Sequence, residues 1–138
     1  MSAFPLLLLA LIFYNLLALG GGMVGGADIG ALLNQGFSVT MPSAAVWAFT
    51  WSDLFVAISL GLLFLEVVKA TRTGRGEILN HAFSTLIFVS ALVEFLLLPG
   101  FATSAFALLT LMALFDVVAG YTISIVSARR DLMVPTEE

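Results

Sequence analysis

Three carboxylic acids, Asp53, Glu94 and Asp116, lie in long apolar stretches of this sequence, and no lysine or arginine stands near any of them. Carrying such an acid into a bilayer costs about 2.5–3.5 kcal/mol on insertion scales, so an intramembrane acid is a functional candidate by default. The chemistry open to these acids is proton uptake and release, cation binding, or pairing with a basic residue of another chain.

A purely structural role for the acids is the alternative. Burial disfavours the charged form of a carboxyl group, so neutral acids at pH 7 would serve as hydrogen-bonded struts. Counted from the basic turns at 1.5 Å per residue, Asp53 and Glu94 lie level with each other, about 28 Å up. Asp116 lies about 20 Å up, level with Asn15. In this structural role, Asp53 and Glu94 would share a proton or bond to neighbouring hydroxyls, and Asp116 would bond to Asn15.

A second group of polar residues lies around the end of the helix expected at 43–70: Glu66, Lys69, Arg72 and His81. A surface ion cluster on the cytoplasmic side is expected, with a proton-entry point as the alternative. One histidine and no cysteine leave too few ligands for a metal or haem, so we expect no cofactor.

Catalysis is not expected. An enzyme needs a nucleophile, base or metal within mutual reach, and the buried acids are the only clustered groups. The Gly-x-Gly-Asp signature of intramembrane aspartyl proteases is missing, because Gly25-Gly26-Ala27-Asp28 does not supply it. Five basic residues make no nucleic-acid patch.

The elements that carry these residues are predicted to be membrane-spanning. The chain of 138 residues is 61% hydrophobic and 10% charged, whereas soluble domains average about 25% charged. We predict an all-α integral membrane protein, a four-transmembrane-helix bundle with very short loops forming one domain, 1–138. Its helices are expected at about 4–26, 43–70, 78–98 and 102–128, with an outside loop at 27–42, a basic cytoplasmic turn at 71–77 and a cytoplasmic tail at 129–138.

The first helix needs its glycine-rich end to cross. Its clean apolar run, 6–19, is about 21 Å long, short of the roughly 30 Å bilayer core. Small residues four apart allow close helix approach, as in the glycines Gly21, Gly22, Gly25 and Gly26. Alternatively, a flexible loop begins at Gly20. A signal peptide at residues 1–20 is a further alternative, although a signal peptide needs a basic residue near its start and this segment has none.

Small and polar residues recur at three- and four-residue steps on the later helices, as expected for faces that pack inside a bundle. The stripes are Thr50, Asp53, Ala57 and Gly61; Asn80, Ser84, Ile87, Ala91 and Glu94; and Met112, Asp116, Gly120 and Ser124. Trp47 and Trp51, one turn apart in a helix, fit an aromatic belt.

Orientation follows from the basic residues. All five follow either the helix at 43–70 or the helix at 102–128, and two crossings separate those places. The positive-inside rule makes that side cytoplasmic, so both termini are predicted to be cytoplasmic. Compactness and short loops suggest the bacterial inner membrane.

We therefore expect a non-catalytic inner-membrane protein that acts by assembly, as a small subunit of a larger complex or as a homo-oligomer. Its partners would be the lipid bilayer and other membrane subunits or further copies of itself, docked through the glycine face and the buried acids. The alternative is a proton- or cation-coupled small transporter or channel that uses Asp53, Glu94 and Asp116 as a relay.

Overall fold

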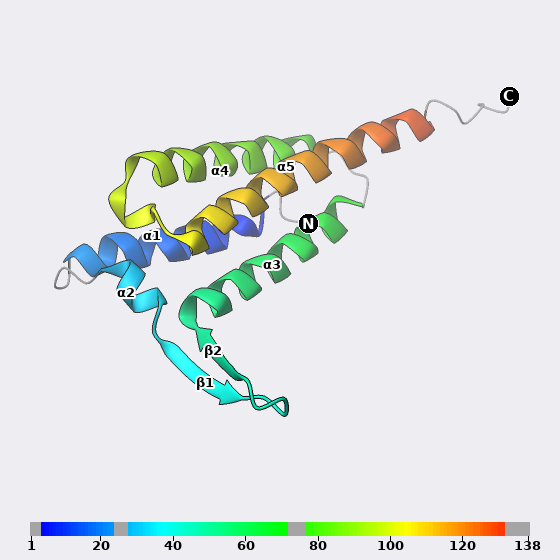
Figure 1. Ribbon diagram of the computed structural model, residues 1–138. Helices are drawn as coiled ribbons and strands as arrows, with labels where there is room; N and C mark the ends of the chain where they lie inside the picture. The colour runs from blue at the N-terminus through cyan, green and yellow to red at the C-terminus, as the bar shows by residue number, and fades with distance from the viewer. Residues whose placement is uncertain (1–3, 24–27, 72–76, 132–138) are drawn as a thin grey trace, which may run out of the picture.

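The structure is a bundle of helices that lie side by side, with a β-hairpin at one end (Figure 1). The computed structural model describes residues 4–23, 28–71 and 77–131. Its main helices are α1 (Leu7–Met23), α3 (Trp51–Ala70), α4 (Glu77–Leu97) and α5 (Ser104–Asp131). Three of these, α3, α4 and α5, are long and apolar enough to cross a membrane, and α1 contributes a shorter apolar segment, Leu7–Gly20. The prediction of a mostly helical fold with apolar helices long enough to cross a membrane is thus confirmed.

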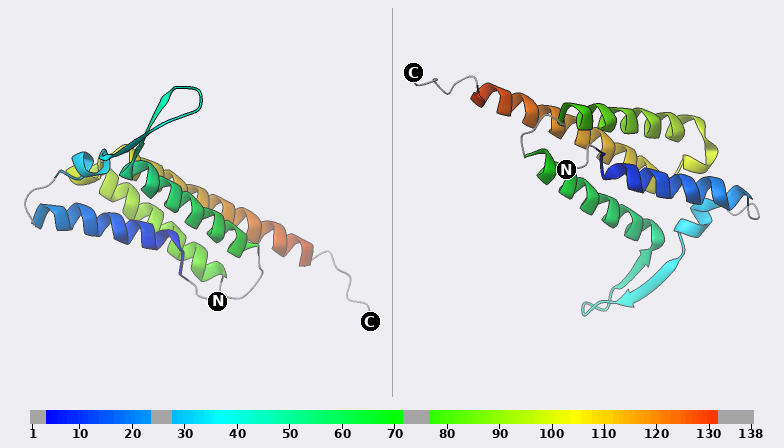
Figure 2. Two further views of the ribbon diagram at one scale, coloured as in Figure 1. Left: turned by 90° about the horizontal axis from the view of Figure 1, so that it is seen from below. Right: turned by 180° about the vertical axis from the view of Figure 1, so that it is seen from behind.

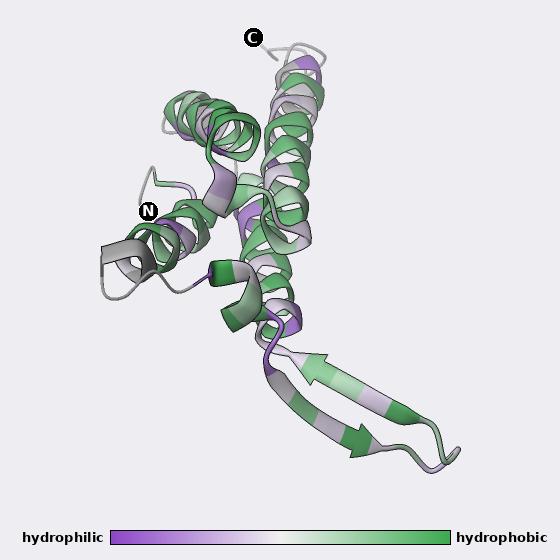
Figure 3. Ribbon diagram, turned by 60° about the vertical axis from the view of Figure 1, so that its left-hand side comes forward, coloured by the Kyte–Doolittle hydropathy of each residue, from purple (hydrophilic) through white to green (hydrophobic). Residues whose placement is uncertain are grey.

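Most of the ribbon of the main helices carries the colour of hydrophobic residues (Figure 3). Leucine, alanine and phenylalanine fill them, and leucine and alanine are strong helix formers. Large apolar side chains on every main helix remain exposed, among them Leu16, Phe64, Leu96 and Val118. Such a surface is typical of helices that face lipid, because large exposed apolar patches are rare on proteins dissolved in water.

Helix α5 is central to the bundle and packs most extensively against α4 and α3 (Figure 2). The tightest part of the core is aromatic: Tyr14, Phe101 and Phe106 are buried and their rings contact one another. The Tyr14 hydroxyl hydrogen-bonds to Thr103 Oγ1 at 2.6 Å. This contact ties α1 to the start of α5.

Residues 43–50 do not begin a helix, and that prediction is wrong. Two antiparallel strands, β1 (Gly36–Thr40) and β2 (Val46–Thr50), form a hairpin here. Aromatic and β-branched residues dominate β2, and such residues favour strands. Trp47 therefore lies on a strand instead of one helical turn before Trp51.

Helix α3 begins at Trp51 because a capping box fixes its start. The Asp53 amide donates to Thr50 Oγ1 at 3.2 Å, and the Thr50 amide donates to Asp53 Oδ2 at 2.8 Å. Two otherwise unpaired amides are satisfied in this way. The acid predicted to lie inside the membrane is thus part of a helix terminus.

The predicted outside loop, 27–42, also contains regular structure. A short helix, α2 (Ile29–Leu33), is capped by Asp28, whose Oδ1 accepts from the Gly30 amide at 3.0 Å. Strand β1 follows it. A side chain at Gly36 would overlap the Phe49 carbonyl oxygen, so the first hairpin pair requires glycine.

Helix α1 continues through the first glycines to Met23, so the helical interpretation holds that far. Gly25, Gly26, Arg72, Arg75 and the tail from 132 lie outside the described residues. A short 3-10 turn, η1 (Pro99–Phe101), joins α4 to α5, as expected for a proline-glycine connection.

Candidate functional site

One group of polar side chains, the inner polar cluster, consists of Glu66, Lys69 and Asn80 with the backbone of Phe4 and Leu6. Glu66 Oε1 accepts from Asn80 Nδ2 at 2.8 Å and from Lys69 Nζ at 3.0 Å, and Oε2 accepts from the Leu6 amide at 2.7 Å. Lys69 Nζ also donates to Asn80 Oδ1 at 3.1 Å and to the Phe4 carbonyl at 3.0 Å.

This cluster is internal. Glu66 is 1% exposed, so the expectation of a surface ion cluster is wrong for this residue. Glu66 lies on the face of α3 that also buries Ser59, Leu63 and Ala70, where α1, α3 and α4 meet. The charged groups are paired, as buried charges must be, and the cluster joins three segments of the chain.

His81 lies beside the cluster but bonds to a different helix. Its Nε2 lies 2.9 Å from Ser124 Oγ of α5, and its ring rests on Gly120, where a side chain would overlap the imidazole. The Tyr121 ring packs on it as well. Among the described residues no group of three or more histidines, cysteines or acids could hold a metal ion.

Asp116 is 5% exposed on α5, and no donor of the described residues reaches hydrogen-bond geometry with its carboxylate. Ser84 of α4 lies against it, and the Ser84 hydroxyl is buried without a partner among the described atoms. The charged or titratable groups nearest to this pair are Glu66, Lys69 and His81. A buried carboxyl group next to an unpaired hydroxyl can hold a proton or a bound water.

Asn15 serves a different acid from the one expected. Its Nδ2 donates to Glu94 Oε2 at 3.0 Å and to the Leu11 carbonyl at 3.1 Å. The predicted bond between Asn15 and Asp116 does not form. Equal depth along two helices does not determine which side chains face each other.

Asp53 is exposed and does not meet Glu94. Its carboxylate accepts from the Thr50 amide and hydroxyl, both at 2.8 Å. Of the two expected partners, Asp53 thus has the neighbouring hydroxyl and not Glu94. The three candidate acids therefore occupy three separate places: a helix start, an Asn15 contact and the buried Ser84 pair. They do not form a continuous relay.

The small-residue stripe of α3 faces outward, against expectation. Asp53, Ala57 and Gly61 are all exposed, and a side chain at Gly61 would meet no atom within 4 Å. The stripes predicted on α4 and α5 do face the interior at Asn80, Ser84, Ile87, Ala91, Met112, Asp116 and Gly120, all of which are buried. We call Asp53, Ala57 and Gly61 the α3 stripe.

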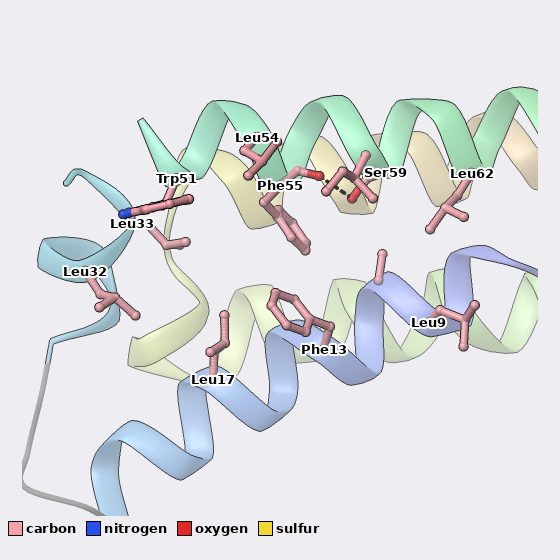
Figure 4. Close-up of a pocket in the computed structure, with 12 residues that line it drawn as sticks. Leu9, Phe13, Leu17, Leu32, Leu33, Trp51, Leu54, Phe55, Ser59 and Leu62 are labelled. Atoms are coloured by element: carbon pink, nitrogen blue, oxygen red, sulfur yellow. Dashed lines mark hydrogen bonds between the residues drawn. The ribbon is translucent and has the colours of Figure 1, made fainter. Parts of the chain in front are cut away.

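An apolar groove of about 670 Å³ runs between α1 and α3. Figure 4 shows Phe13 and Leu17 of α1 opposite Phe55 and Leu54 of α3, with Trp51 at one end. The one hydroxyl in its lining, that of Ser59, donates to the Phe55 carbonyl at 2.8 Å. The groove can therefore receive only apolar groups.

Sequence reasoning singled out Glu66 and Lys69 but missed the backbone of Phe4 and Leu6 and the groove. The groove has no signal in the sequence, because it depends on how far α1 stands from α3. No protein-family model, curated protein or solved structure matches this chain, so the functional conclusions rest on the geometry of the bundle.

Proposed function

We propose that this protein is a non-catalytic, multi-pass protein of the bacterial inner membrane that acts by assembly, as a small subunit of a larger complex or as a homo-oligomer. In this proposal α1 is a fourth crossing and both termini are cytoplasmic. Support comes from the groove, which Leu9 and Leu62 line at one end and Leu17 and Trp51 line at the other. Helix α1 thus follows most of the length of α3.

The observation that carries the proposal is the outward α3 stripe. Lipid tails are as apolar as leucine, so helices in a bilayer associate through close van der Waals packing, which small residues permit. Ala57 and Gly61 stand four residues apart and both are exposed. A partner helix that packs along Ala57 and Gly61 could therefore come close to the α3 backbone.

The groove extends this face. Leu54 and Ile58 lie between the stripe and the groove on α3, and both line the groove. Side chains of a helix seated on the stripe can reach over them into the 670 Å³ space. The partner that fits is an apolar membrane helix, from another subunit or a second copy.

The acids contribute less to docking than expected. Glu94 and Asp116 turn toward the chain's own helices, whereas Asp53 stands exposed at the end of the stripe. Asp53 is therefore the most exposed of the three acids to a lysine or arginine of the partner. The α3 stripe, and not the buried acids, becomes the proposed contact.

The test is the variant Gly61→Leu, analysed by mass in a gentle detergent. The new side chain meets open space in the isolated chain but would collide with a packed partner, so we expect a smaller particle. Val118→Leu, on the exposed face of α5, is the matched control and should keep the wild-type mass. A wild-type protein that is already a lone monomer, or a Gly61→Leu particle of unchanged size, would contradict the proposal.

A second candidate function, proton- or cation-coupled transport, is favoured by the buried pair of Asp116 and Ser84. The Ser84 hydroxyl lies against the Asp116 carboxyl group, and a buried acid with so few polar neighbours is costly in a core unless it is used. Asp116→Asn should then abolish proton uptake in proteoliposomes and leave the assembly mass unchanged. Asp53→Asn is the control, because Asp53 lies apart from the pair. Equal uptake by both variants and the wild type would exclude this candidate.

A further inference from the structure

One face of the hairpin is apolar and uncovered. Cross-strand partners Phe37 and Phe49, and Val39 and Trp47, stand two residues apart along each strand, so all four side chains share a face. The ring of Phe49 lies 5.3 Å from that of Phe37 and 5.4 Å from that of Trp47. Phe37 is 58% exposed and Trp47 52%.

The opposite face differs in character. It carries Gly36, Ser38, Thr40, Val46, Ala48 and Thr50, which are small or hydroxyl-bearing apart from Val46. No charged residue occurs anywhere from residue 29 to residue 52. The hairpin is therefore amphipathic but entirely neutral.

The hairpin receives little support from the bundle. Its strands pair with each other, and its junction with α3 is marked by the Trp51 amide, which donates to the Gln35 carbonyl at 2.9 Å. An isolated two-stranded hairpin is marginal in water. Four large apolar side chains on one face thus require a cover that the described chain does not supply.

The direction of the hairpin indicates what the cover is. It leaves the end of α3 sideways, across the helix axes, in both Figure 1 and Figure 2. This end of α3 is the one far from Lys69, because α3 runs from Trp51 to Ala70. If α3 spans the bilayer, Trp51 marks the level of the membrane surface and the hairpin extends along that surface.

We propose that the hairpin lies flat in the lipid headgroup region, with Phe37, Val39, Trp47 and Phe49 turned toward the acyl chains. A five-residue strand is about 17 Å long at 3.3–3.4 Å per residue. The headgroup region on each side is only about 5–8 Å thick, so a flat hairpin fits it and an upright one does not. Tryptophan is enriched at this level because its ring is apolar and its N–H is polar.

Lipid fits this surface better than a protein partner does. The two faces of the hairpin match the two sides of the headgroup region, because the aromatic face can meet acyl chains while Ser38 and Thr40 on the opposite face hydrogen-bond to headgroups and water. The surface is also continuous with Trp51 and Leu54 of α3, which are exposed at the adjoining end. The inference shares the membrane setting of the proposed function and is independent of assembly.

The chain has two tryptophans, so Trp51→Phe leaves Trp47 as the only reporter. The variant is placed in phosphatidylcholine vesicles brominated at different depths of the acyl chain. We expect Trp47 emission to be quenched most strongly by bromines close to the headgroup and little by iodide in the buffer. Ser38→Trp, in a chain with Trp47→Phe and Trp51→Phe, reports from the opposite face and should be quenched by iodide.

Two results would overturn the inference. Iodide quenching of Trp47 without lipid quenching would place the hairpin in water, and shielding from both quenchers would mean that a protein covers it. Trp47→Phe, with Trp51 as reporter, separates this failure from failure of the membrane setting. Lipid quenching of Trp51 but not Trp47 removes only the hairpin inference, and quenching of neither removes both.

Discussion

Glu66 is expected to contribute strongly to the stability of the fold, because both of its carboxylate oxygens are hydrogen-bonded. Three donors from three segments converge on its two oxygens: the Leu6 amide, Lys69 and Asn80. A surface ion pair contributes little to stability, but removing one partner of a buried pair leaves an uncompensated charge. Glu66 belongs to the second class, since it is almost fully buried.

Glu66→Leu should therefore destabilise the protein by about 3 kcal/mol, the lower end for breaking a buried ion pair, because Lys69 keeps some access to solvent. Thermal unfolding in detergent, followed by circular dichroism, measures the change. Arg129→Gln, at an exposed position, is the control and should have little effect. Equal melting temperatures for the two variants would show that the inner polar cluster is not structural.

Gly120 is a second position at which a single substitution should affect stability, because a larger side chain does not fit there. Gly120→Ala places a methyl group where the His81 ring lies, so the ring must move and its bond to Ser124 must break. Overpacking of this kind costs about 1–3 kcal/mol. Gly20→Ala is the control, because it adds the same methyl group to a glycine of α1 where the new atom would have no neighbour within 4 Å. We expect a lower melting temperature only for Gly120→Ala, although alanine is the better helix former at both positions; a similar loss in both variants would contradict the steric cause.

The sequence could predict the faces of these residues but not their partners. Asn80, Ser84 and Asp116 recur with the helical period and do lie inside. Asn15 was expected to bond to Asp116 and bonds to Glu94 instead, because partner choice depends on the rotation and tilt of each helix. Those quantities are set by packing between helices, which no single segment encodes.

At the scale of elements, the hairpin is the feature that helical periodicity missed. A long uncharged run favoured one continuous helix from residue 43, yet its first eight residues contain strand β2. Two local signals pointed the other way: the aromatic and β-branched residues Val46, Trp47, Phe49 and Thr50, and the Thr50–Asp53 capping pair. The capping pair alone could have located the start of α3.

The hairpin turn contains a correctable strain. Ala44 has a positive φ of 64°, a conformation that costs a residue with a Cβ about 1 kcal/mol or more relative to glycine. Ala44→Gly should slow hydrogen exchange of the Met41 amide, which donates to the Ala45 carbonyl, by roughly fivefold, since 1.4 kcal/mol is a factor of ten.

Ala45→Gly is the matched control, because Ala44 is the only non-glycine residue with positive φ in the described chain. Glycine at Ala45 gains no conformational relief and loosens the unfolded turn, so exchange should stay the same or become faster. Faster exchange in Ala44→Gly as well would mean that the turn is not held in this conformation.

For the whole molecule, composition predicted the class of fold and left the arrangement open. Hydrophobic content and charge-free stretches indicate helices in lipid, and three helices meet the length that crossing requires. A helix that is apolar nearly all round does not show which of its faces packs inward. The central position of α5 and the groove between α1 and α3 could therefore not be predicted from the sequence. A fourth crossing by α1 would place the N-terminus on the cytoplasmic side of the membrane.

The absence of cysteine makes this topology testable by labelling. Phe4→Cys, Thr71→Cys and Gly100→Cys introduce single thiols at exposed positions. With four crossings, an impermeant maleimide added outside sealed cells should label Gly100→Cys alone. Phe4→Cys and Thr71→Cys should react only after the membrane is opened. Labelling of Phe4→Cys from outside would place the N-terminus on the wrong side.

The bonds that hold α1 are made late in the life of the chain. The Leu6 amide binds a residue 60 positions downstream, Asn15 one 79 positions downstream, and Tyr14 one 89 positions downstream. As the ribosome works from the N-terminus, α1 emerges long before Glu66, Glu94 and Thr103 exist. The first helix to be synthesised is thus the last to be locked in place, and a nascent chain that ends before Glu94 would hold α1 only through Glu66.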